Sequence, residues 1–328
     1  MQKSLRVESG ARRDLRSRSW RLDIKRFPAR RLTEAAECSV LTSNSTATIE
    51  PAMSRWIFLV LLVLYRPLPA HAFGCDRTFA GGQAPVLLNA KLAPRTTPLC
   101  YQAYAVLASG VTRGPLWSAE HLTAQGLANA RATTRDGQFH EEDQLPPDDR
   151  ATLADYVRSG FDRGHMAPSG DMPDPVAQQQ SFSLANIVPQ APELNRGLWE
   201  GIERGVRRLA EREGDLYVVT GPAFQGQQVQ SLKGRVLVPT ATWKAIYDPV
   251  ARGAGAYMCP NVSRPDCTTL SIAALSRTIG LDPFPWVPNA VKRTAMQLPA
   301  PEPSRYWSTG QRGRHSQQRQ GLFDWLLK

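Results

Sequence analysis

Apolar residues recur every three or four positions between residues 193 and 212, the repeat of a helix with one buried face. The repeating positions are Leu194, Leu198, Ile202, Val206 and Leu209. Beside them, Asn195, Trp199 and Glu203 form a second stripe at intervals of four residues. The pattern predicts a helix that presents an amide and a carboxylate on one side, about 12 Å apart along its axis. That separation is too large for both groups to bind one ion directly.

Shorter runs rich in β-branched and aromatic residues predict strands. They cover residues 101–107, 117–122, 215–220, 236–239, 243–247 and 256–258. We expect 236–239 to pair with 243–247, Phe161 to end a strand, and His165 to lie in the next one. Helices are predicted to begin near 176 and to cover 271–278. Because strands come in runs with helices inserted, the sequence predicts an α+β fold with mainly antiparallel pairing.

The two ends of the chain differ in composition from its middle. Residues 1–52 are rich in Arg and Ser and lack periodicity, so we expect them to be disordered or not translated. Residues 53–72 have the layout of a secretory signal peptide, with a short apolar run and a small-residue cleavage pattern. The alternative is a mitochondrial presequence followed by a membrane anchor. A catalytic domain is predicted over 73–295, and a Pro-rich, then basic and aromatic tail over 296–328.

The net charge of +11 is unevenly distributed along the chain. Residues 1–72 contain 13 Lys and Arg against 6 Asp and Glu, which leaves 27 against 23 for the rest. Bulk charge is therefore weak support for nucleic-acid binding by the predicted domain, and any basic groove must be local.

Four cysteines remain after the predicted signal peptide, and four cysteines in an exported protein usually pair. Of the three connectivities, Cys75–Cys100 with Cys259–Cys267 is favoured by its short loops. Buried free thiols are the alternative. A zinc site is disfavoured because no Cys-x-x-Cys spacing occurs.

The chemistry of the chain is concentrated in residues 162–168 (Asp-Arg-Gly-His-Met-Ala-Pro), read with Asn195 and Glu203 downstream. Hydrolysis of a phosphodiester needs a base with a pKa near neutrality, which His165 can supply. Arg163 can neutralise the charge that develops on the phosphate with a planar fork of donors. The oxygen of Asn195 is a suitable ligand for a hard divalent cation. We expect the flanking Gly164 to let the backbone approach the substrate.

These motifs resemble those of the DNA/RNA non-specific endonuclease family, which has the ββα-metal (His-Me finger) fold. The resemblance is carried by residues 162–168, 182–190 (Phe-Ser-Leu-Ala-Asn-Ile-Val-Pro-Gln), 194–195 with Trp199 and Glu203, 217–222 and 238–240. It covers roughly residues 100 to 290, and several ordered motifs make it more specific than one short pattern.

The resemblance implies a role for each site residue. His165 would be the general base and Asn195 the direct protein ligand of Mg²⁺, for which Mn²⁺ can substitute. Arg163 would stabilise the transition state, and Glu203 would hold a water molecule on the metal. Asn186 would be a further polar group of the site. The upstream arginine of the family falls on Arg135, with Arg131 as the competitor.

The substrates implied by the resemblance are DNA and RNA, cut to 5′-phosphate and 3′-hydroxyl ends. A homodimer is left open, and no stable membrane association is expected after signal cleavage. Two rival functions are an inactive nucleic-acid-binding protein and a phosphodiesterase restricted to single strands. The sequence contains no G-x-S-x-G, H-E-x-x-H or Walker motif, so other common hydrolase chemistries are not indicated.

Several other polar residues have competing interpretations. His121 is expected to be structural rather than a second base. Asp171 and Asp174 are expected to cap and form turns rather than bind a second metal, although Asp171 has a possible role in orienting His165. Lys244 is predicted either to reach a phosphate or to keep an edge strand soluble. Residues 140–143 are predicted to form a solvated loop, and Glu203 has an alternative role as an ion-pair partner of Arg207.

Overall fold

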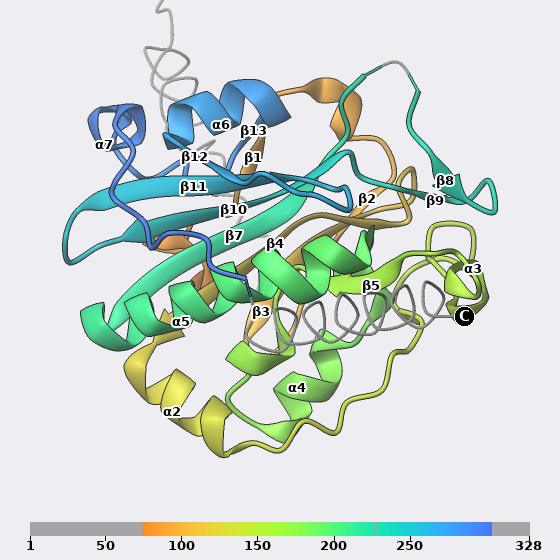
Figure 1. The fold of residues 1–328 in the computed structure, drawn as a ribbon, viewed down its shortest axis with the longest axis horizontal. Coiled ribbons are helices and arrows are strands. Elements are labelled where there is room, and N and C mark those ends of the chain that lie inside the picture. The colour runs from red at the N-terminus through yellow and green to blue at the C-terminus, as the bar shows by residue number, and fades with distance from the viewer. Residues whose placement is uncertain (1–74, 227, 304–328) are drawn as a thin grey trace, which may run out of the picture. The chain divides into compact units, whose positions relative to one another are not determined.

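The centre of the protein is a seven-stranded sheet, seen in a computed structural model that describes residues 75–226 and 228–303 (Figure 1). Its strand order is β12-β11-β10-β7-β4-β3-β2, and every neighbouring pair is antiparallel. The strands are β2 (Thr96–Cys100), β3 (Tyr104–Ser109), β4 (Gly114–Thr123), β7 (Asp215–Ala223), β10 (Ala241–Asp248), β11 (Gly253–Pro260) and β12 (Thr268–Leu270). The predicted α+β fold with mainly antiparallel pairing is confirmed.

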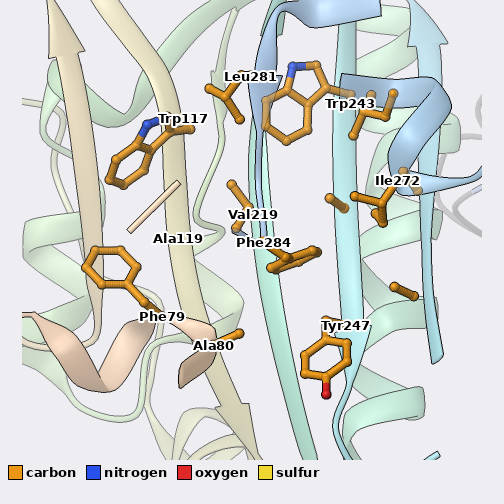
Figure 2. Packing of buried hydrophobic residues seen from close by; sticks show 14 of the residues in the cluster. Phe79, Ala80, Trp117, Ala119, Val219, Trp243, Tyr247, Ile272, Leu281 and Phe284 are labelled. Carbon is orange, nitrogen blue, oxygen red and sulfur yellow. The ribbon is translucent and has the colours of Figure 1, made fainter. Parts of the chain in front are cut away.

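Both faces of the sheet are covered, so its central strands are apolar on both sides. In β7, for example, Val219 belongs to one hydrophobic cluster and Val218 to the cluster on the opposite face. Figure 2 shows the first cluster, in which Trp117, Trp243 and Phe284 pack with their neighbours. This face lies under α6 (Ile272–Ile279), α7 (Asn289–Arg293) and the short β1–β13 pair (Val86–Leu87 and Leu281–Asp282).

The opposite face packs against α5 (Glu200–Glu213), with α2 (Ala124–Ala132) and α4 (Pro175–Ser181) on the same side (Figure 1). The predicted apolar stripe of α5 is buried as expected: Ile202, Val206 and Leu209 are each at most 4% exposed. They join a cluster that includes the sheet residues Val218 and Ile246. Burial of apolar area therefore fixes α5 to the sheet.

The predicted catalytic segment is inserted between the two neighbouring central strands β4 and β7. Within it, β5 (Asp162–His165) pairs antiparallel with β6 (Ile187–Gln190), and the helix containing α5 follows. This order of two strands and a helix is the expected ββα finger. His165 is the last residue of the first strand rather than part of the second, and Phe161 precedes that strand, which corrects both predictions.

The predicted pairing of residues 236–239 with residues 243–247 is wrong. Its structured part, β9 (Val236–Leu237), pairs with β8 (Ser231–Leu232), while β10 pairs with β7 and β11. A two-residue strand has too little surface to compete for a central position, which the longer β7 and β11 occupy. The small helix α3 (Leu153–Tyr156) precedes the finger.

Both predicted disulfides, Cys75–Cys100 and Cys259–Cys267, are present. None of the helices among residues 75–226 and 228–303 combines the length and apolar character required to cross a bilayer. The predicted extension 1–52 and signal peptide 53–72 lie outside the described residues, as does the tail beyond 303. The described start of that tail, residues 296–303, packs on the domain, where Met296 N donates to Ala254 O and Tyr257 Oη donates to Pro299 O.

Candidate active site

A cavity of about 370 Å³ opens within the finger, between β5 and the helix that follows β6. Five of the six predicted site residues line it: Arg135, Arg163, His165, Asn195 and Glu203. They come from three separate segments, so the cavity exists only in the folded chain. Arg131, the competitor for the upstream arginine, instead forms an ion pair of 2.7 Å with Glu211 and does not line the cavity.

The imidazole of His165 is held in an apolar setting at the end of β5. Its ring lies 5.3 Å from that of Phe139 and 4.9 Å from that of Phe182, between centroids. Burial, helped by the charge of Arg135, lowers the pKa of His165 to about 3. The side chain is therefore neutral near pH 7 and free to accept a proton, but its pKa lies well below the near-neutral value expected of the general base. Its Nε2 is enclosed and meets no hydrogen-bond partner within the described residues.

The amide of Asn195 has a fixed orientation. Its Nδ2 donates to Asp162 Oδ2 at 2.9 Å, and the same carboxylate oxygen accepts from Arg196 Nε at 2.7 Å. Asp162 therefore anchors the nitrogen end of the amide. The oxygen end, Oδ1, receives no hydrogen bond from residues 75–226 and 228–303, which leaves it available to a cation. A hard divalent ion with an oxygen preference fits this donor.

The helix that carries Asn195 is not regular, because residues Leu194–Trp199 form a π-helical turn before α5 begins at Glu200. A π turn contains one residue more than the α repeat assumed in the sequence pattern. Trp199, which shares the predicted stripe with Asn195 and Glu203, packs in the core against the sheet and is only 1% exposed. Glu200 takes its place in the lining of the cavity.

Glu203 lines the same cavity as Asn195 and lies next to several charged side chains. Burial, with contributions from Asp171 and Glu200, raises its pKa to about 7 against the opposing effect of Lys244 and Arg207. The alternative ion pair with Arg207 is not the contact formed, since Arg207 Nη1 donates to Asp171 Oδ1 at 2.7 Å.

Asn186 occupies a different place from the one expected. It is fully buried and does not line the cavity. Its Oδ1 accepts from Ser118 Oγ and Ala167 N, and its Nδ2 donates to the carbonyls of Ala167 and Ser181. All its polar atoms are thus committed to the protein. The structure corrects the prediction: Asn186 lies outside the cavity lining and holds the backbone of Ala167, two residues after His165.

Gly164 also has a different function from the one expected. A Cβ at this position would lie 2.2 Å from Gln190 Oε1, on the strand that pairs with it. Glycine is therefore required by the close packing of β5 on β6.

Lys244 neither reaches the cavity lining nor lies on an edge strand. It is 1% exposed on β10, inside the sheet, where its Nζ donates to Thr220 Oγ1 at 2.7 Å and lies 5.6 Å from the Trp199 ring. Both interpretations of Lys244 were wrong, because the neighbouring strands could not be assigned correctly from sequence.

The remaining alternatives are resolved by direct contacts. Asp174 caps α4 by accepting from Val176 N and Ala177 N, as expected. Asp171 pairs with Arg207 and therefore does not orient His165. His121 pairs with Asp215 away from the cavity. The predicted solvated loop at 140–143 contains Glu142, which is buried and accepts from Ser183 Oγ at 2.6 Å.

Four residues of the site were missed: Arg207, Glu200, Arg196 and the anchoring Asp162. Arg207 follows Glu203 by four residues, a spacing that places both on one side of a helix, so the sequence contained a signal for it. Burial acts to lower the pKa of Arg207, but Asp171 and Glu203 outweigh it and hold the pKa above its ordinary value. Glu200 had no such signal, because it depends on the π turn.

A profile of the DNA/RNA non-specific endonucleases matches residues 88–290, which is more than half of the chain. The chain belongs to this family. Nuclease C1 of Cunninghamella echinulata var. echinulata is 38% identical over 175 residues, 49% of this chain and 69% of that protein. Mitochondrial endonuclease G of Bos taurus is 33% identical over 201 residues, 56% of this chain and 66% of that protein.

The family fold is also found among solved structures. A structure of the EndoG/EndoGI complex, which concerns EndoG inhibition, contains a chain that superposes with a TM-score of 0.53 at 28% identity. The match covers 56% of this chain and 84% of that one. The arrangement of finger and sheet is thus that of the DNA/RNA non-specific endonuclease family.

Proposed function

We propose that the protein is a Mg²⁺-dependent endonuclease that hydrolyses DNA and RNA with little sequence preference, leaving 5′-phosphate and 3′-hydroxyl ends. The observation that carries the proposal is the single cavity in which a neutral imidazole, four arginines and an oriented amide oxygen meet. Family membership and the names of the relatives support the same activity.

The protein residues divide the reaction between them. His165 accepts the proton of the attacking water, since its uncharged ring has a free lone pair. Arg163 and Arg135, with Arg207 deeper in the cavity, stabilise the negative charge that grows on the phosphate. The oxygen of Asn195, held in place by Asp162, is the ligand for Mg²⁺, with Mn²⁺ as a substitute. When bound, the cation supplies positive charge for the leaving oxygen.

The carboxylate of Glu203 lies two turns along the helix from the amide. Its distance along the helix suits an indirect contact with the cation through water, rather than direct binding. In the absence of metal, burial keeps its pKa near 7, so it is partly protonated at neutral pH. A nearby divalent cation favours its ionised form.

Plasmid nicking with and without EDTA tests the proposal directly. We expect supercoiled DNA and a structured RNA both to be cut in Mg²⁺ and to remain intact in EDTA, and His165→Ala to lose activity. Equal cutting by His165→Ala and the unsubstituted protein would contradict the base assignment. Binding without cutting would favour the inactive nucleic-acid-binding alternative, and cutting of single strands alone the restricted phosphodiesterase.

We further propose that the protein is secreted or periplasmic. The two disulfides support an oxidising compartment, and the signal-peptide pattern of residues 53–72 agrees with export. The mitochondrial relatives represent the alternative. Mass spectrometry of the mature amino terminus distinguishes the two: a start at Phe73 supports export. A homodimer stays a prediction, to be tested by light scattering in solution.

A further inference from the structure

Two phenylalanine rings pack against polar side chains that line the cavity. Phe139, in the loop after α2, and Phe182, at the end of α4, pack edge to face with their centroids 4.9 Å apart and their planes at 70°. The His165 ring lies against both of them. Neither phenylalanine lines the cavity. We call these two residues the aromatic bracket.

Each ring of the bracket also carries one guanidinium. The Cζ atom of Arg163 lies 4.4 Å from the centroid of Phe139, and that of Arg135 lies 5.3 Å from the centroid of Phe182. Within the described ranges, neither of these arginines forms an ion pair or a hydrogen bond through its side chain. The aromatic faces are therefore the contacts that hold the two guanidinium groups at the cavity.

This mode of support differs from that of Arg207 and Arg196, the other two arginines that line the cavity. Arg207 is held by the carboxylate of Asp171, which uses one of its donors and offsets its charge. An aromatic face attracts a guanidinium through the ring quadrupole and leaves its N–H donors free at the edge. Arg163 and Arg135 thus keep their full charge and donors for a phosphate.

The bracket is itself rigidly supported. His140 N donates to Phe182 O at 3.2 Å, and Leu184 N donates to His140 O at 2.9 Å, so the two segments are linked through their backbones. A Cβ on Gly137 would lie 2.1 Å from the Phe182 ring, so the loop before Phe139 rests closely on that ring. The rings are fixed before any substrate arrives.

We propose that Phe139 and Phe182 are positioning residues, which set the distance and orientation of Arg163 and Arg135 around His165 without consuming their hydrogen-bond donors. The inference rests on the proposed phosphodiester hydrolysis. It adds two residues that act through other side chains and do not contact the substrate themselves.

A double-mutant cycle between Phe139 and Arg163 tests the proposal. Phe139→Leu keeps apolar bulk but removes the aromatic face, and we expect kcat on plasmid DNA to fall about 3- to 30-fold, the range of a cation–π contact. In an Arg163→Gln background, where no cation faces the ring, the same substitution should lower the residual kcat less than 2-fold. Phe139→Tyr, which restores an aromatic face, should recover most of the activity.

Phe161→Leu is the matched control, because Phe161 packs against the same hydrophobic cluster as Phe139 but carries no guanidinium. Phe161→Leu should change kcat equally in both backgrounds. The melting temperature of this variant reports the cost of lost packing. An equal effect of Phe139→Leu with Arg163 present and in the Arg163→Gln background would overturn the proposal, while the proposed nuclease activity would stand. If the unsubstituted protein failed to cut, the proposed function itself would fail, so the two outcomes are distinguishable.

Discussion

At the scale of single residues, the site depends on side chains that orient other side chains. Asp162 holds both Asn195 and Arg196, and Asp171 holds Arg207. Such anchors are needed because an amide or guanidinium on a flexible stem loses entropy when a ligand fixes it. Orientation in the free protein reduces that cost before the metal or the phosphate binds.

Asp162→Ala should lower the apparent affinity for Mg²⁺ by about 10- to 100-fold, because the Asn195 amide loses its anchor. Activity measured over a Mg²⁺ titration would show a higher half-saturating concentration. Asp215→Asn is the control, since this carboxylate pairs with His121 away from the cavity. An unchanged titration for Asp162→Ala would show that the amide needs no anchor.

The buried imidazole also predicts a pH response of the metal-free protein. Because the pKa of His165 is lowered to about 3 in the folded state, the unfolded chain binds more protons between pH 6.5 and 3. This group therefore stabilises the fold above pH 6.5 and loses that contribution as pH falls towards 3. NMR titration should find the ring neutral at pH 5, and His165→Asn should make the acid loss of stability shallower. A midpoint near 6.5 would refute the buried state.

At the scale of elements, the π-helical turn Leu194–Trp199 decides which residues share the cavity. It shifts the lining from Trp199 to Glu200, while the apolar stripe of α5 keeps its contact with the sheet. The cavity lining thus depends on a π turn, which a regular α-helical repeat in the sequence does not predict.

Deletion of Leu198, a half-buried residue of this turn, should let the helix continue as a regular α-helix. Since one residue corresponds to about 100° of helix rotation, Asn195 would turn away from the cavity while α5 stays in register. We expect activity to fall more than 100-fold with little change in far-UV circular dichroism. A deletion variant that retained activity would show that the turn does not position the amide.

At the scale of the whole molecule, the disulfides fasten peripheral segments to the domain. Cys75 and Cys100 are separated by 25 residues, and Cys259 and Cys267 by 8. Closing the longer loop restricts the unfolded chain more, by about 3–4 kcal/mol against about 2–3 kcal/mol for the shorter one.

Replacing both Cys75 and Cys100 by Ser should lower the melting temperature by roughly 10 °C, and the Cys259 and Cys267 pair by less. Calorimetry of both double variants under non-reducing conditions shows which disulfide contributes more to the melting temperature. Equal melting temperatures for the unsubstituted protein and both variants would show that the bridges contribute nothing to stability.

The sequence alone determined the chemistry and the class of fold. Local periodicity identified α5 and its buried face, and the ordered motifs around His165 and Asn195 identified the family, because both signals lie in short stretches of chain. The tertiary structure decided what depends on contacts between distant segments: the burial of Asn186 outside the cavity lining, the burial of Lys244 within the sheet, the presence of Arg135 rather than Arg131 in the cavity lining, and the aromatic bracket. These follow from strand pairing, loop packing and a π turn, none of which has a local pattern in the sequence.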